Sequence, residues 1–162
     1  MINFCSAGLS TYNLSYQYNL LLMKKIYINL PVKSLVKSIA FYEAIGLVKQ
    51  DDFSNDDGAG MKWSDEIYFM LLTHTFTQNF IQTKEIADAN TVANAIYAFE
   101  FESKDEVNAI VSKALAAGAE TYKNKYTEQF EFMYSTSIVD PDGYIIEAFY
   151  MDTSKFPSPE VV

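Results

Sequence analysis

Strand-like and helix-like hydrophobic patterns follow one another in the same order twice along the chain. A strand pattern at residues 26–32 is followed by an apolar helical run and then by three further strand patterns. The same order begins again at residues 96–101. A β-α-β-β-β unit that occurs twice predicts an α+β fold, in which two modules, residues 26–73 and 95–151, form a curved mixed-sheet cup.

Polar residues and glycines indicate where the two long helices begin and end. Ser34 and Ser103 can each accept a hydrogen bond from the first free backbone N–H groups of a helix. Glu106 follows Ser103 at the spacing of a capping box, in which each side chain accepts a hydrogen bond from the other residue's N–H. Gly46 and Gly118 can adopt the left-handed conformation that ends a helix. We therefore expect one helix between each serine and the glycine that follows it.

The first strand of each module assigns one of its faces to the core and the other to the cup. Every second residue from Ile28 is aliphatic, and every second residue from Tyr97 is aromatic. Because a helix should cover the more apolar face, the opposite face looks into the cup. The residues that this argument assigns to the cup are Tyr27, Asn29, Ile96, Ala98 and Glu100.

Three segments fall outside the two modules. Residues 1–22 contain no charged residue and no regular period, and they lack the basic start and continuous apolar core of a signal peptide. We expect an extension outside a domain that spans residues 23–152, with a docking arm or an atypical leader as the alternatives. Residues 74–94, with a helical pattern around residues 84–89, are expected to form a linker that covers part of the cavity, or a solvated connector. We expect residues 153–162 to form a C-terminal tail.

Composition excludes several classes of partner. The formal net charge is −9, with 12 Lys and Arg against 21 Asp and Glu, which argues against nucleic acid and is compatible with a neutral or cationic small ligand. Cys5 is the only cysteine, so a disulfide framework and a cysteine-based zinc site are excluded. No stretch of about 20 apolar residues predicts a membrane span. We interpret the protein as cytoplasmic.

Two motifs carry a family resemblance. The segment from Asn29 to Gly46 resembles the opening of a vicinal oxygen chelate module, found in glyoxalase I, fosfomycin and bleomycin resistance proteins, and extradiol dioxygenases. The segment Asp140-Pro-Asp-Gly-Tyr-Ile-Ile-Glu147 resembles its closing strand. Residues 64–72 and the linker resemble the branch called predicted lactoylglutathione lyase. The resemblance covers residues 24–152 and implies the same two-module fold as the repeat.

The resemblance also implies a divalent metal held by side chains at four strand positions. In this sequence those positions carry Tyr27, Met70 (Leu71 if the register shifts by one), Ile96 and Glu147. In the family the metal acts as a Lewis acid on a developing anion. Only Glu147 is a usual ligand, because a tyrosine has a pKa of about 10 and isoleucine has no donor atom. We therefore expect a degenerate metal site and no cofactor, a divalent metal being doubtful.

Glu147 remains a candidate for a site without metal. It lies in an apolar strand, where a carboxylate needs a partner, and Tyr27, Asn29 or Tyr134 could donate the hydrogen bond. Glu100 could form a carboxylate pair with it and give an acid–base couple. His74, the only histidine, is expected to be structural or incidental.

Two functions stay open. The first is a binding module, similar in logic to bleomycin resistance proteins, that holds a small organic ligand in the cup. The second is a glyoxalase I-like lyase or isomerase in which Glu147 is the general base and the metal is non-standard. The resemblance and the many aromatic residues also favour a homodimer. The residues expected to contact the ligand are Tyr27, Asn29, Met70, Ile96, Glu100 and Tyr134.

Overall fold

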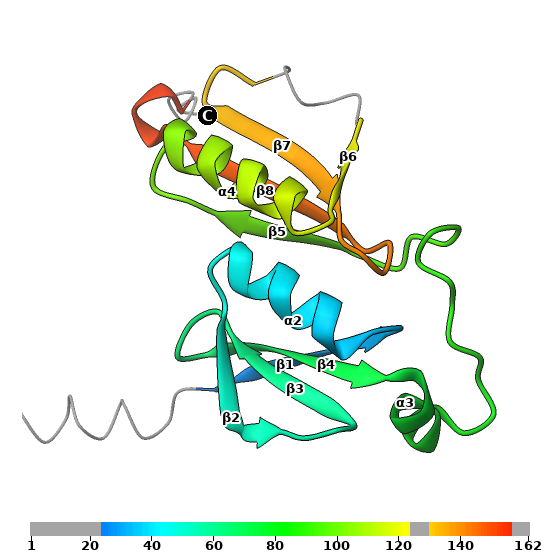
Figure 1. The fold of residues 1–162 in the computed structure, drawn as a ribbon. Helices are drawn as coiled ribbons and strands as arrows, with labels where there is room; N and C mark the ends of the chain where they lie inside the picture. The colour runs from blue at the N-terminus through cyan, green and yellow to red at the C-terminus, as the bar shows by residue number, and fades with distance from the viewer. Residues whose placement is uncertain (1–23, 124–129, 157–162) are drawn as a thin grey trace, which may run out of the picture.

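The computed structural model describes residues 24–123 and 130–156 and contains two modules with the same order of elements (Figure 1). The predicted extension at residues 1–22 lies outside the described residues. The first module consists of β1 (Ile26–Val32), α2 (Leu35–Ala44), β2 (Val48–Ser54), β3 (Gly58–Lys62) and β4 (Ile67–Thr73). The second consists of β5 (Ile96–Glu100), α4 (Lys104–Ala116), β6 (Glu120–Tyr122), β7 (Met133–Val139) and β8 (Ile145–Met151).

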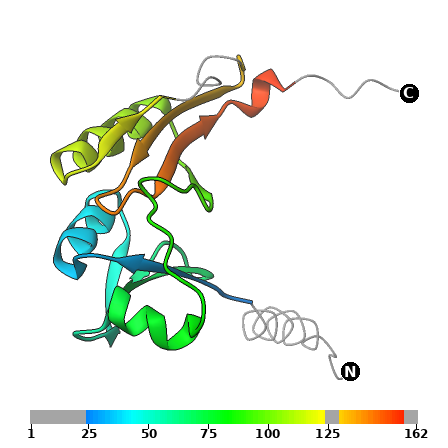
Figure 2. The same cartoon turned by 90° about the vertical axis from the view of Figure 1, so that its right-hand side faces the viewer.

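Each module contains one four-stranded mixed sheet. The strand orders are β1-β4-β3-β2 and β5-β8-β7-β6, and the first and last strands of each module pair in parallel. Both α2 and α4 lie on the same side of the two sheets (Figure 2), and β5 is the edge strand that faces the first module (Figure 1). The predicted α+β fold is therefore confirmed, although within residues 24–123 and 130–156 no strand pairing joins the two sheets into one closed surface.

Both long helices begin at the predicted serines. The Ser34 hydroxyl accepts a hydrogen bond from the N–H of Lys37 at 3.4 Å, and the Ser103 hydroxyl accepts one from the N–H of Glu106 at 3.1 Å. The Glu106 carboxylate accepts from the N–H of Glu102 at 2.8 Å, one residue before the expected donor. The glycines that follow the helices have φ of +104° and +100°, so the predicted helix ends are confirmed.

One hydrophobic core extends through both modules. Leu30 and Val32 of β1 are buried, as the alternation in that strand predicts. On β5 the aromatic face contacts the first module: the Phe99 ring lies 5.4 Å from that of Phe69 and 4.7 Å from that of Trp63. The two modules are therefore held against each other by aromatic packing, which contributes stabilisation beyond the area that it buries.

The segment between the modules differs from the sequence prediction. Its helix is α3 (His74–Ile81), whereas no helix forms around residues 84–89, so the predicted position was wrong. The physical reason is the cap: the Thr73 hydroxyl, at the end of β4, accepts a hydrogen bond from the N–H of Phe76 at 3.2 Å and starts the helix there. A 3-10 turn at Thr153–Lys155 follows β8. None of the described helices is long and apolar enough to cross a membrane.

Candidate ligand site at the seam between the modules

Three of the predicted site residues share one face of the first sheet. Asn29 is the strand partner of Met70, and Tyr27 lies two residues before Asn29 on the same strand. The residues that alternate with them on β1, such as Leu30, are buried in the core. The face that carries Tyr27 and Asn29 is therefore the one that the helix does not cover. Tyr27 is 45% exposed, and its ring stacks on that of Tyr68 at 5.1 Å. Strand alternation therefore places Tyr27, Asn29 and Met70 together on the face of this sheet opposite the buried Leu30.

The corresponding face of the second sheet carries Ile96, Ala98, Glu100 and Glu147. Ala98 is the strand partner of Glu147 on one side, and Ser137 is its partner on the other. Glu147 is therefore half-buried between two small side chains. Ile96 lies two residues before Ala98 and is 61% exposed. Glu100 lies two residues beyond Ala98, on the same face.

Tyr134 does not join the other predicted residues. It is the strand partner of Tyr150, on the face of the second sheet that α4 covers. Its hydroxyl donates a hydrogen bond to the side-chain oxygen of Asn108 at 2.7 Å. Because Tyr134 is an odd number of positions from Ser137, the strand partner of Glu147, its side chain leaves the opposite face of the sheet. The prediction that Tyr134 could donate to Glu147 was therefore wrong.

The four positions implied by the resemblance do not fit a divalent metal. Of Tyr27, Met70, Ile96 and Glu147, only the last offers a carboxylate, and a single carboxylate does not fill the coordination sphere of zinc or of harder cations. Within residues 24–123 and 130–156, no group of three His, Cys, Asp or Glu side chains could hold a metal ion. The chemistry of the donor set therefore disagrees with the metal site that the resemblance implies.

A cleft opens where β1 and β4 of the first module meet β5 of the second. We call this cleft, of about 210 Å³, the seam cleft. The Tyr97 ring contacts the Phe69 ring edge to face at 5.6 Å. Apart from the Trp63 indole nitrogen and the Tyr97 hydroxyl, its side chains carry no polar atom. The residues that line the seam cleft are Ile28, Trp63, Ile67, Phe69, Ile96, Tyr97, Ala98 and Phe99.

The arrangement of the two sheets has counterparts among solved structures. A hypothetical protein from S. aureus aligns at a TM-score of 0.66 with 20% identity, over 82% of this chain and 98% of that one. A glyoxalase/bleomycin resistance protein/dioxygenase family enzyme from Burkholderia phytofirmans aligns at 0.65 with 18% identity, over 78% and 97%. A glyoxalase-related enzyme from Fulvimarina pelagi aligns at 0.65 with 18% identity, over 80% and 88%. The chain has the glyoxalase/bleomycin resistance fold.

Sequence comparison adds no closer relationship. No protein-family model matches the chain, and no curated protein matches it either. The structural alignments, at about 20% sequence identity, establish the glyoxalase-like fold. Because one fold can support many activities, the function has to be inferred from the site itself.

The turn between β7 and β8 connects the second module to the first through buried carboxylates. One oxygen of Asp140 accepts hydrogen bonds from the N–H groups of Asp142 and Tyr144, at 2.9 and 2.8 Å. Its other oxygen accepts from the hydroxyl of Tyr42, on α2, at 3.0 Å. Burial raises the pKa of Asp140 to about 6, and the three hydrogen bonds oppose this effect only in part.

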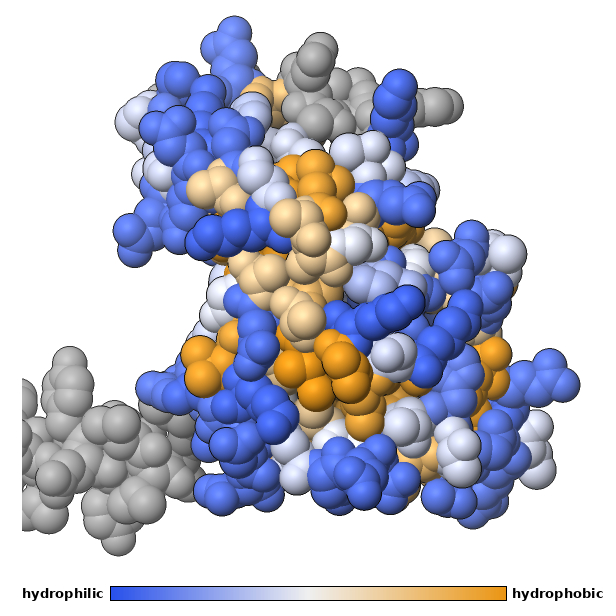
Figure 3. All heavy atoms as spheres, in the orientation of Figure 1, coloured by the Kyte–Doolittle hydropathy of each residue, from blue (hydrophilic) through white to orange (hydrophobic). Residues whose placement is uncertain are grey.

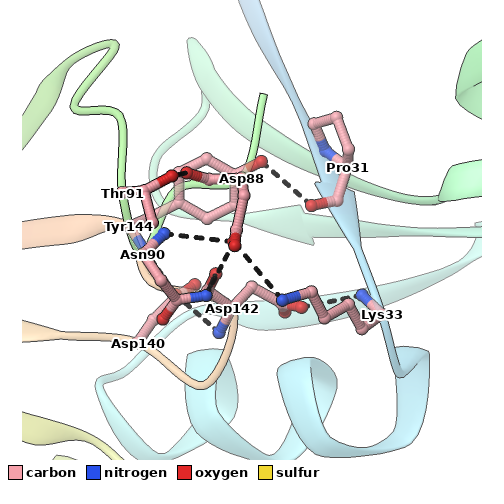
Figure 4. A network of polar contacts seen from close by, with 8 residues as sticks. All are labelled: Pro31, Lys33, Asp88, Asn90, Thr91, Asp140, Asp142 and Tyr144. Atoms are coloured by element: carbon pink, nitrogen blue, oxygen red, sulfur yellow. Dashed lines mark hydrogen bonds and ion pairs between the residues drawn. The ribbon is translucent and has the colours of Figure 1, made fainter. Parts of the chain in front are cut away.

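Asp142 makes the second set of contacts between the modules. Its carboxylate accepts hydrogen bonds from the N–H of Lys33 and from the hydroxyl of Ser38, each at 2.7 Å. Nearby, the Tyr144 hydroxyl donates to the carbonyl oxygen of Pro31 at 2.9 Å (Figure 4). Together with Tyr42 and Asp140, these residues form what we call the aspartate network. Both aspartates of the Asp-Pro-Asp-Gly motif therefore accept hydrogen bonds from the first module.

The linker also contacts this turn. The Asn90 side chain donates to the carbonyl oxygen of Asp142 at 3.3 Å, and Asp88 accepts from Asn90 and lies 3.4 Å from the Lys33 ammonium (Figure 4). A Cβ atom at Gly143 would lie 2.6 Å from the backbone nitrogen of Asn90. His74 lines a cavity of about 70 Å³ beside these residues. No polar residue of the linker enters the lining of the seam cleft.

Sequence reasoning did not identify Tyr42 and Ser38 as members of this network. Both lie on the buried face of α2 and are fully buried. A signal was present: they stand four residues apart on the apolar stripe of the predicted helix, where a polar group needs a partner. The partners themselves follow 98 and 104 residues later and could not be inferred from local pattern.

Proposed function

We propose that this protein is a vicinal oxygen chelate superfamily member that binds a small organic ligand in the seam cleft without a divalent metal. The observation that carries the proposal is the lining of that cleft. Its walls are aromatic and aliphatic side chains from both modules, with two polar atoms, those of Trp63 and Tyr97, available for hydrogen bonds. A concave, mostly apolar site with few polar groups, at an interface between structural units, is typical of small-molecule binding.

The lining favours a ligand with a flat aromatic or aliphatic group. The rings of Trp63 and Phe99 meet edge to face at 4.7 Å, and those of Phe69 and Tyr97 at 5.6 Å. Rings that already pack against one another lose little conformational freedom when a ligand binds, and this lowers the entropic cost of association.

The cup face supplies the polar contacts for the rest of the ligand. Ile96 and Ala98 line the seam cleft and also lie on the cup face, beside Glu147. A ligand that extends out of the cleft along this face meets Glu147, the strand partner of Ala98. We propose Glu147 and Asn29 as its polar contacts, with Tyr27 and Met70 as further contacts.

The test uses the tryptophan of the site. Trp63 is the only tryptophan in the chain and lines the seam cleft, so its emission responds to a ligand that binds beside it. We expect benzyl alcohol to shift that emission saturably, and we expect excess EDTA to leave the titration unchanged. In the Ala98→Leu variant, in which a larger side chain occupies the cleft, affinity should fall at least tenfold.

The matched control is Ala116→Leu, an exposed position on α4 that is remote from the cleft lining. This variant should bind as the wild-type protein does. Binding that survives in Ala98→Leu, or no emission change with any aromatic probe, would overturn the proposed site. Turnover of a hemithioacetal substrate that requires added metal and the Glu147 carboxylate would instead support the lyase.

We further propose that the protein is a homodimer that covers the cup face. Tyr27, Phe53 and Ile96 are 45%, 54% and 61% exposed. Phe53 belongs to this face because a Cβ atom at Gly60, the strand partner of Met70, would lie 2.9 Å from the Phe53 Cβ. Large apolar groups gathered on one face favour burial against a partner. Light scattering should give about twice the chain mass of 18.4 kDa, and a monomer at micromolar concentration would refute the proposal.

A further inference from the structure

The free edge of strand β5 lies in the seam cleft. In the described sheets β5 pairs with β8 on one side only, and its other side faces the first module (Figure 1). Four consecutive residues of β5, from Ile96 to Phe99, line the cleft. In the space-filling view the molecule narrows between the two modules, and apolar residues gather there (Figure 3). An unpaired strand edge is therefore part of the proposed ligand site.

The backbone groups of β5 point alternately towards β8 and towards this free edge. The N–H of Phe101 donates to the carbonyl oxygen of Phe149, on β8, at 2.8 Å. Because successive residues of a strand alternate, the N–H and C=O groups of Ile96 and Ala98 point away from β8. Within residues 24–123 and 130–156, no hydrogen bond reaches these outward groups. The cleft therefore offers backbone donors and acceptors in addition to its two polar side-chain atoms.

The edge of β1, on the other side of the seam, shows how such groups can be satisfied. Strand β1 runs in the opposite direction to β5 (Figure 1). Its outward carbonyl group at Pro31 accepts a hydrogen bond from the Tyr144 hydroxyl, and its outward N–H at Lys33 donates to the Asp142 carboxylate. Where the modules touch, side chains of the second module thus pair with an edge of the first. The outward groups of β5 have no such partner in the structure that is described.

Strand β5 also lacks the features that keep other edge strands from pairing. Charged residues, proline, irregular register and short length all prevent the addition of another strand. Strand β1 contains Pro31, and β6 has only three residues. Strand β2 carries Lys49, Asp51 and Asp52, with an irregular register between Gln50 and Ser54. The first four residues of β5, Ile-Tyr-Ala-Phe, include none of these features, and such an edge is open to a further strand.

The position of this edge favours a single extended chain as its partner. The cleft of about 210 Å³ beside it is too small for the sheet of a second copy, but it can hold an apolar side chain. An extended peptide has donors and acceptors at the spacing of a strand edge, and its alternate side chains can enter pockets beside that edge. The aromatic rings of Trp63 and Phe99 supply such a pocket.

We propose that the ligand of this protein is a short peptide with an aromatic side chain, bound as an added strand on the edge of β5 with its ring in the seam cleft. This inference rests on the proposed function, because the ring is the aromatic group that the cleft holds. It adds the peptide backbone as the second feature that is recognised. In an antiparallel addition, one residue of the peptide exchanges two hydrogen bonds with the N–H and C=O of Ala98.

The experiment tests the backbone of the peptide with the full chain. N-acetyl-Ala-Phe-Ala amide is titrated while Trp63 emission is followed, and benzyl alcohol serves as the probe for the ring alone. We expect the peptide to bind at least tenfold more tightly than benzyl alcohol. Two analogues carry one N-methyl group each, on the phenylalanine or on the alanine that follows it. Because successive N–H groups of a strand point to opposite sides, only one of the two analogues should lose affinity, by at least tenfold.

The variant that isolates the protein's contribution is Ala98→Pro. Proline removes the outward N–H of Ala98, and the pairing with β8 should persist because this N–H does not belong to it. Ala98→Val, which adds a similar volume and keeps the N–H, is the matched control. The two variants should change the affinity for benzyl alcohol equally, whereas Ala98→Pro should bind the peptide at least tenfold more weakly than Ala98→Val. Their melting temperatures check that both fold, and the methylated peptides test the wild-type protein independently.

The outcomes separate this inference from the proposed function. If both methylated peptides bind as the parent does, or both lose affinity equally, the peptide is not bound as a strand and the inference is wrong, while binding of benzyl alcohol still supports the proposed function. If Ala98→Pro disrupts a dimer in light scattering and leaves the peptide affinity unchanged, the edge pairs with a second copy and the inference is also wrong. If neither the peptide nor benzyl alcohol changes the Trp63 emission, the proposed function and the inference fail together.

Discussion

The two modules meet through two regions that are built from opposite chemistry. Around Trp63 the interface is apolar and contains a cleft of about 210 Å³. Around Asp140 it is polar and more closely filled, with a cavity of about 70 Å³ beside it. In the polar region each oxygen of the two buried aspartates accepts a hydrogen bond. The comparison shows how a cleft between two separate sheets can stay open: directional contacts in one region hold the modules at a fixed distance in the other.

Stability and ligand binding depend on different regions of this interface. Hydrogen bonds fix angles as well as distances, whereas apolar packing does not. If the aspartate network orients the modules, substitutions in it should reduce the free energy of unfolding. Substitutions that line the seam cleft should chiefly affect ligand affinity. The following predictions test this division, from the largest expected effect to the smallest.

Asp142→Ala should destabilise the protein most. It removes the charged acceptor of two donors, the N–H of Lys33 and the hydroxyl of Ser38, which keeps only the carbonyl oxygen of Ser34 at 2.9 Å. Hydrogen bonds to a charged group contribute about 1.5–3 kcal/mol each, so we expect a loss of about 3 kcal/mol in a urea titration. Asp52→Ala, at an exposed position of β2, is the control and should cost less than about 0.5 kcal/mol. Equal effects of the two substitutions would show that the network does not stabilise the fold.

Asp140→Asn should remove a pH dependence of stability. The pKa of Asp140 is about 6 in the folded protein because the group is buried, and it is 3.8 without that burial. The folded state therefore binds a proton more tightly than the unfolded state. The stabilisation that results is complete below about pH 4 and is lost as pH rises through 6, by an amount on the order of 2–3 kcal/mol.

The measurement is the free energy of unfolding of both proteins from pH 4 to pH 7. In this range the wild-type value should fall relative to that of the variant, whose amide keeps the shape of the protonated acid. Subtracting the two curves cancels the other carboxylates, such as Asp51 and Asp65, whose pKa values are lowered by their lysine partners. Parallel curves would contradict the burial of Asp140 as an ionisable group.

Tyr42→Phe should cost less than Asp142→Ala. It removes one hydrogen bond, from the phenol to Asp140 at 3.0 Å, and keeps the packing of the ring in the core. We expect a loss of about 1–2 kcal/mol in thermal unfolding. The same substitution should raise the pKa of Asp140 further, because the phenol stabilises the ionised form. A loss of stability without that shift would mean that the phenol and the carboxylate do not interact.

Lys33→Ala should have the smallest effect. The Lys33 backbone N–H donates to Asp142, but its ammonium lies 3.4 Å from Asp88 with both side chains about half exposed. An exposed ion pair contributes about 0–1 kcal/mol, so the melting temperature should change by no more than about 2 °C. A larger fall in the melting temperature, measured by differential scanning calorimetry, would show that the Lys33 side chain stabilises the fold. We attribute that stabilisation to its backbone N–H.

The sequence was sufficient for features that depend on neighbouring residues. The serine caps and the two glycines after the helices lie close to the groups that they serve, so spacing alone predicts them. The faces of β1 could also be read, because its aliphatic positions strictly alternate with polar or exposed ones. Strand β7 is different: Tyr134 is followed by three small polar residues and then by Ile138 and Val139, so both faces contain apolar groups. The face of Tyr134 depends on pairing with β8, which the pattern does not define.

The site was less predictable than the fold because its parts come from distant segments. Alternation along β5 puts Ile96 and Glu100 on one face, but the seam cleft could not be inferred, since Trp63 meets Phe99 and Phe101 only when the modules associate. Asp140 was recognised as part of a motif, and its contact with Tyr42 was not. To predict a contact between residues about 100 positions apart, one must know how the two modules are placed relative to each other. Local periodicity does not contain that information.

The lack of strand pairing between the two sheets has a consequence for how this architecture can change over generations. Backbone hydrogen bonds are the same for nearly every residue type, so a sheet that continued through both modules would keep its geometry whatever its side chains. Here the angle between the two modules depends on contacts between side chains, and single substitutions can alter it. A duplicated module joined in this way can acquire a wider, narrower or differently charged cleft in small steps while each half continues to fold as before.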